Sequence, residues 1–88
     1  MKYIIVEHNQ VEQAVLFSEA MEHRAMAANF TDKQVKSAAK FDLAWTASSP
    51  GGPWKPVATC YGQSVGLGLK ARPEDDEIIE RTIMFKGI

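Results

Sequence analysis

The chain has 88 residues, a net charge of −1 and 45% hydrophobic residues, which is the composition of one folded domain and not of a disordered chain. Its balanced charge provides no field that would draw it onto a nucleic-acid backbone, so nucleic acid is not an expected partner. Cys60 is the only cysteine, and with His8 and His23 it forms none of the spacings typical of zinc sites. We therefore predict no disulfide, no metal and no cofactor.

The first seven residues are apolar over too short a run for a signal peptide, and no run of 18 apolar residues follows. We expect a cytoplasmic protein without a membrane segment. A domain of this size buries only about 60 to 65% of the surface of its unfolded chain, so we also expect oligomerisation to add stability.

Residues 3–6 are β-branched and aromatic and predict a strand, which ends at the turn formers His8 and Asn9. Residues 10–28 fit two interpretations. One is a single long helix with Asn9 as its N-cap. The other, which we favour, is a second strand over 11–17 and a helix that begins after Ser18 and ends near Asn29.

Residues 35–46 alternate apolar and polar side chains towards their end and predict a third strand. Two prolines and two glycines within 48–53 then predict a surface loop. Alternation resumes over 54–61, which indicates a fourth strand antiparallel to the third, and Pro56 either places that strand at a sheet edge or delays its start.

Three glycines within 62–69 predict a bulge or a close approach of two backbones. Pro73 and the acidic run 74–77 predict the start of a helix that continues to the end of the chain. The predicted fold is α+β: strand, strand, helix, strand, strand, helix, with both helices on one face of an antiparallel sheet.

Arg72 and His23 are the charged or titratable candidates for a binding site. The glycines before Lys70 and Arg72 suggest a phosphate cradle, but their spacing matches no phosphate-binding motif. We predict instead that Arg72 and Asp75 contact the backbone or each other and so hold the glycine segment in place. His23, in the first predicted helix, is typical of a packing or hydrogen-bonding residue.

Trp45 and Trp54 flank the Pro/Gly loop and would lie near one another in a hairpin. That placement suits an aromatic pair that closes the hairpin, or an exposed binding platform. With Lys36 and Lys40, the platform would make a small-ligand or nucleic-acid binding module. The three lysines of 33–40 also fit an ordinary solvated face.

The last predicted helix carries apolar residues on adjoining rows, more than one thin sheet can cover. We predict a homodimer whose interface includes Ile83, Met84, Phe85 and Ile88. In the alternative interpretation, the tail folds back into its own core.

The stretch 61–75, YGQSVGLGLKARPED, resembles small uncharacterised proteins of prophages and integron gene cassettes. These share a tyrosine-glycine-glutamate-serine stretch, then leucine-glycine-leucine, then serine-arginine-proline-glutamate-aspartate. Gln63, Gly66 and Ala71 depart from that pattern. The resemblance implies an origin in a mobile genetic element and favours the hairpin over the long helix, and it implies no activity.

Two classes of function remain open. The first is a non-catalytic accessory or interaction protein that acts as a homodimer and binds a host or phage protein. The second is the binding module built on Trp45, Trp54, Lys36 and Lys40. No paired carboxylates or nucleophile with a base are visible in the sequence, so an enzyme ranks third.

Overall fold

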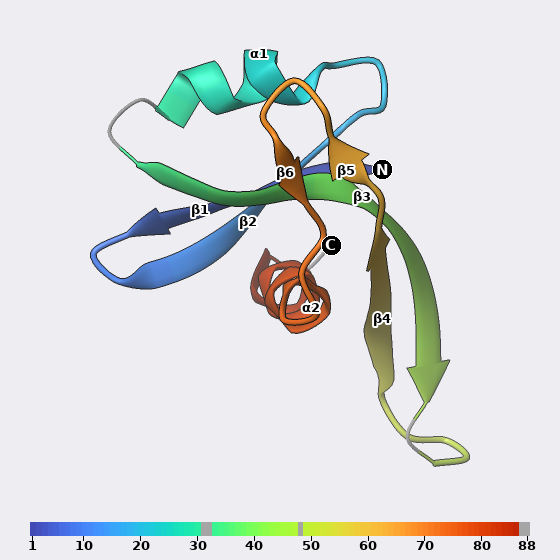
Figure 1. Ribbon diagram of the computed structural model, residues 1–88. Helices are drawn as coiled ribbons and strands as arrows, with labels where there is room; N and C mark the ends of the chain where they lie inside the picture. The colour runs from blue at the N-terminus through green and yellow to red at the C-terminus, as the bar shows by residue number, and fades with distance from the viewer. Residues whose placement is uncertain (31–32, 48, 87–88) are drawn as a thin grey trace.

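The computed structural model describes residues 1–30, 33–47 and 49–86 (Figure 1). It confirms the α+β class and the predicted order of elements, to which it adds a small sheet of two short strands. In chain order the elements are β1 (Lys2–His8), β2 (Val11–Phe17), α1 (His23–Ala27), the 3-10 turn η1 (Ala28–Phe30), β3 (Gln34–Ala47), β4 (Trp54–Tyr61), β5 (Gln63–Ser64), β6 (Leu69–Lys70) and α2 (Asp75–Lys86).

The β1–β2 hairpin confirms the predicted break of the long helix. His8 pairs with Val11, and the two residues between them, Asn9 and Gln10, have φ values of 52° and 65°. Two successive positive φ values are the geometry of a two-residue hairpin turn, whose twist matches that of the flanking strands. We predicted the turn pair His8–Asn9. The structure instead places the turn one residue later, at Asn9–Gln10.

The main sheet has the strand order β2-β1-β3-β4, and all neighbours are antiparallel. Pairing of β1 with β3 shifts by one residue between Ile5 and Val6, which leaves Lys36 as the extra residue of a bulge. The structure confirms the predicted edge position of β4. Pro56 is tolerated there because proline has no backbone N–H that would need a partner.

The two helices cover opposite faces of the sheet, so the predicted placement on one face is wrong (Figure 1). On one face Tyr3 and Ile5 pack with Ile79 and other apolar residues of α2. On the other, Ile4 and Val6 pack with residues of α1 and η1. All four β1 residues of the 3–6 run are buried, as in a strand that is covered on both faces.

Helix α1 is shorter than predicted, because Ser18 forms a turn instead of a helix cap. The Ser18 hydroxyl accepts the N–H of Ala20, and its carbonyl accepts the N–H of Met21. These bonds fix the chain before His23, where the helix begins. The glycine segment forms the β5–β6 hairpin and not a bulge, and the close neighbour of Gly66 is the side chain of Arg24 and not a second backbone.

Strands β3 and β4 continue beyond the core as a two-stranded extension, here called the arm: residues 44–47 of β3 and 54–57 of β4 (Figure 1). The arm contributes to a longest dimension of 43 Å, against 26 and 21 Å. Most of its side chains are exposed, in contrast to the buried middle of β3. The core therefore lies between β1, the middle of β3 and the two helices.

Candidate functional site

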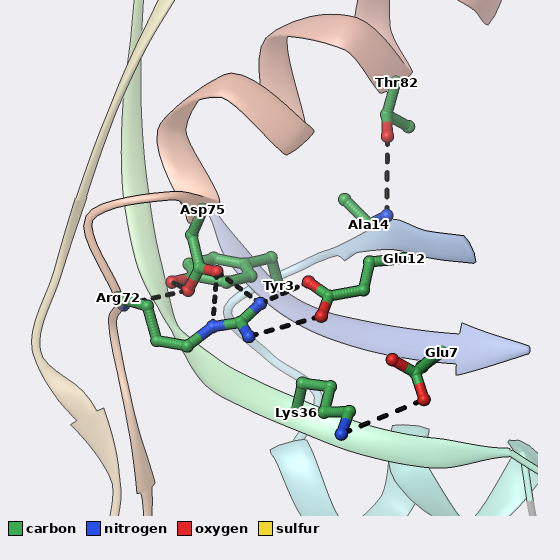
Figure 2. A network of polar contacts seen from close by, with 8 residues as sticks. All are labelled: Tyr3, Glu7, Glu12, Ala14, Lys36, Arg72, Asp75 and Thr82. Carbon is green, nitrogen blue, oxygen red and sulfur yellow. Dashed lines mark hydrogen bonds and ion pairs between the residues drawn. The ribbon is translucent and has the colours of Figure 1, made fainter. Parts of the chain in front are cut away.

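Arg72 stands just before α2, in a polar network that joins three segments far apart in the sequence (Figure 2). Its Nε donates to Oδ1 of Asp75 at 3.0 Å, and its Nη2 donates to Oε1 of Glu12 on β2 at 2.7 Å. The backbone N–H of Arg72 donates to Oδ2 of Asp75, while the N–H of Asp75 donates back to the Arg72 carbonyl. This reciprocal cap confirms the predicted contact between Arg72 and Asp75.

Tyr3 completes this network from inside the core. Its hydroxyl donates to Oδ2 of Asp75 at 2.6 Å, and both side chains are fully buried. Burial and the bond to Asp75 raise the pKa of Tyr3 far above its ordinary value, so the hydroxyl stays a donor. Because Asp75 is closed off from solvent and engaged by Tyr3 and Arg72, the network anchors α2 and offers no surface to a substrate.

Helix α2 also seals the outer edge of β4. The Asp76 carboxylate accepts the N–H of Cys60, and the Glu80 carboxylate accepts the N–H of Ala58, both at 2.8 Å. Asp76 and Glu80 are four residues apart, which is a rise of about 6 Å along a helix, and Ala58 and Cys60 are two residues apart, which is about 6.7 Å along a strand. Because the two spacings nearly match, each carboxylate lies opposite one of the outward N–H groups of the edge strand. The next position along β4 is Pro56, which needs no acceptor.

Cys60 is not an activated nucleophile. Burial, and then the neighbouring Asp76 carboxylate, raise the pKa of its thiol to about 12, since both disfavour the thiolate. The thiol therefore stays protonated at neutral pH.

His23 is buried, and its surroundings are those of a packing residue. Its Nε2 lies 2.9 Å from the carbonyl oxygen of Ala39, an acceptor, so this nitrogen carries the proton. Its ring meets the Phe17 ring edge-on, with 5.4 Å between centroids. His23 nevertheless also lines a hollow between α1 and β5.

Trp45 and Trp54 lie on one face of the arm, the face that continues the α2 side of the sheet. Trp45 pairs with Pro56 and Trp54 with Ala47, so the two tryptophans are diagonal neighbours. Their exposed fractions are 44% and 66%. The rings form no aromatic pair in the part of the chain that the structure describes, so the arm presents them to solvent.

The lysines of the predicted binding module do not join the tryptophans. Lys40 lies 3.8 Å from Glu19 on the opposite face of the sheet, the face of α1. Lys36 pairs with Glu7 at 3.9 Å, at the bulge and about 30 Å of strand from Trp45 (Figure 2). The four residues therefore form no common surface.

The four residues of the predicted dimer interface divide into three groups. Ile83 is buried in the core of its own subunit, so its assignment to an interface is wrong. Met84 and Phe85 are 59% and 89% exposed, and Phe85 lines a groove of about 600 Å³ between α2 and residues 10–14, which are the end of the hairpin turn and the first half of β2. Ile88 lies outside the described residues.

The sequence analysis did not identify four residues that form hydrogen bonds between elements far apart in the sequence: Tyr3, Glu12, Asp76 and Glu80. Tyr3 carried a signal, because a hydroxyl within an otherwise apolar run requires a buried partner. So did the acidic run 74–77, which has more carboxylates than a helix dipole uses. Neither signal identifies the partner.

No family model, curated protein or solved structure matches the chain. Neither helix of the described chain is both long and apolar enough to cross a membrane. Within residues 1–30, 33–47 and 49–86, no three His, Cys, Asp or Glu side chains come together as ligands for a metal ion.

Proposed function

We propose that this chain is a non-catalytic interaction protein of a mobile genetic element, which acts as a homodimer through the exposed side of α2. The observation that carries the proposal is the exposure of Phe85, 89% of whose surface is open to solvent beside the half-exposed Met84. An aromatic side chain this exposed is typical of an interface and unfavourable in a free monomer.

The exposed side of α2 is suited to self-association. Arg81 and Phe85 lie one helical turn apart on it, and both are exposed. An antiparallel pair of α2 helices about a twofold axis would bring Arg81 of each copy to Phe85 of the partner subunit, so the same cation–π contact would form twice. Each fully buried Met or Phe contributes about 1.5 to 3 kcal/mol against an association cost of at least about 4 kcal/mol. The tightest dissociation constant that these contacts allow is therefore roughly micromolar.

In this proposal the dimer binds a host or phage protein through the arm. Trp45 and Trp54 support that role, because exposed tryptophans are enriched at the centre of protein interfaces. Their face of the arm has no Lys or Arg, since Lys55 points to the other face. A protein partner therefore fits this surface better than nucleic acid.

Sedimentation across a dilution series from about 100 to 1 micromolar tests the dimer at the dissociation constant expected from these contacts. The wild type should dissociate within that range, whereas Phe85→Lys should be a folded monomer, because it removes the ring and opposes Arg81 of the partner subunit. A lysine also suits the end of a helix, so the fold should be unaffected. Met21→Lys, an exposed apolar residue on the α1 side, is the matched control and should still dimerise. A wild type that is monomeric at the highest concentration would refute the proposal.

A further inference from the structure

A hollow of about 420 Å³ lies on the α1 face of the sheet, opposite the exposed side of α2. It forms where the first residues of β1, the middle of β3, the start of α1 and strand β5 meet. Its volume is within the range of sites that bind small molecules. None of the network around Arg72 belongs to its lining, so the hollow is a separate feature of the fold.

Positive charge dominates the lining of this hollow. Lys2, Arg24 and Lys40 line it together with a single carboxylate, that of Glu22. Lys2 donates to the neutral carbonyl of Met21, and Arg24 makes no ion pair with a described residue. Lys40 reaches Glu19 at 3.8 Å, between two largely exposed side chains, where water weakens such a pair. The hollow therefore keeps a surplus of positive charge.

Two uncharged polar side chains, those of Ser64 and Gln63, also line the hollow. Ser64 lines the hollow, is only 6% exposed, and its hydroxyl makes no hydrogen bond with the described residues. Beside it, the Gln63 amide adds two more donors to the lining. An anion in the hollow would satisfy these donors and the cations together.

The aliphatic stem of Arg24 packs against the β5–β6 hairpin. A Cβ added at Gly66 would lie 3.0 Å from Cδ and 3.3 Å from Cγ of Arg24, so the turn packs directly on the arginine stem. The φ of Gly66 is not among the positive values of the chain, so this glycine is required by space and not by backbone conformation. A guanidinium with a held stem loses less freedom when it binds a ligand.

We propose that this hollow binds a small phosphate-bearing ligand. Lys2, Arg24 and Lys40 would neutralise the phosphate, while Ser64 and Gln63 would donate hydrogen bonds to its oxygens. A phosphate suits the lining better than a carboxylate, because it carries up to two charges and offers three oxygens to donors that approach from several elements. The net charge of −1 disfavours a polymeric phosphate backbone as the ligand.

The test is a titration of isotope-labelled protein with inorganic phosphate and with pyrophosphate at constant ionic strength, followed by amide NMR. We expect saturable shifts confined to residues 63–66 and to the start of α1. Arg24→Gln and Lys40→Gln should each weaken binding about tenfold, the loss of one charge-assisted hydrogen bond. Lys55→Gln removes the same charge from the distant arm and should leave the affinity unchanged.

Gly66→Ala separates a built site from general attraction, because it keeps every charge and displaces only the stem of Arg24. It should weaken phosphate binding in a protein whose spectrum shows an unchanged fold. Absence of saturable shifts, or an equal loss of affinity in Lys55→Gln and Arg24→Gln, would overturn the proposal. Saturable binding of single-stranded DNA at the same residues, with no binding of phosphate or pyrophosphate, would also overturn it.

Discussion

At the scale of single residues, Asp75 is the group on which most of the long-range polar structure depends. It accepts hydrogen bonds from the Tyr3 hydroxyl and from the backbone and side chain of Arg72, and Arg72 reaches on to Glu12 of the edge strand β2. A fully buried carboxylate is costly to desolvate and is tolerated only when its oxygens are all engaged. The start of α2, the start of β1 and the turn end of β2 are thus tied to one side chain.

We expect Asp75→Ala to lower the free energy of unfolding by about 3 kcal/mol, because it leaves the Tyr3 hydroxyl and the Arg72 N–H without an acceptor inside the protein. Tyr3→Phe removes one donor and leaves the Arg72 contacts in place, so it should cost only about 1 kcal/mol. Urea denaturation measures both. Glu74→Ala, an exposed neighbour in the same acidic run, is the control. An Asp75→Ala protein as stable as the control would show that the network contributes nothing.

At the scale of elements, local chemistry made the hairpin and α2 predictable, whereas contacts between distant elements were not. The Asn9 turn and the Pro73 helix start depend on backbone preferences within a few residues. The four-residue apolar run of β1 also indicates a strand that is covered on both faces. Our prediction, which placed both helices on one face of the sheet, did not take this signal into account. The bonds of Ser18 that delay α1 compete with a helix cap that is equally plausible locally.

The candidate site shows the same division. The contact of Arg72 with Asp75 spans three residues and was predicted, but the contact of Arg72 with Glu12 joins positions 60 residues apart. The hollow on the α1 face is lined from four elements, and only the register of the folded sheet brings Lys2 beside Lys40. Sequence alone contains no local sign of either arrangement.

The cover that α2 gives to the edge of β4 leads to a second prediction. Glu80→Ala exposes the N–H of Ala58 on an edge strand, so we expect a loss of about 1 kcal/mol in the free energy of unfolding and faster aggregation, seen by light scattering on heating. Glu80→Gln keeps an oxygen that can accept this hydrogen bond and should behave like the wild type. Equal aggregation of the two variants would mean that the carboxylate does not protect the edge.

At the scale of the whole molecule, the chain consists of a core and an arm that lies outside both apolar clusters. The two apolar clusters are built from β1, β2, the middle of β3, the base of β4, the β5–β6 hairpin and the helices, and no residue of the arm belongs to them. An exposed two-stranded extension is marginally stable by itself. The arm therefore adds little to the apolar core of the fold.

Excision of the arm tests this division. Joining Ala44 to Val57 through an Asn-Gly turn removes residues 45–56, and the new turn suits residues that already pair across the ladder. Because the lost side chains lie outside both apolar clusters, we expect cooperative thermal unfolding with a melting temperature within about 5 °C of the wild type, a loss below about 1 kcal/mol.

Sedimentation should show the dimer retained, since Phe85 is untouched. Capture experiments should lose any protein bound through Trp45 and Trp54, as should the full-length double variant Trp45→Ala, Trp54→Ala. If the shortened chain does not fold while the double variant does, the arm is part of the folding unit, and its tryptophans alone can then be tested for binding.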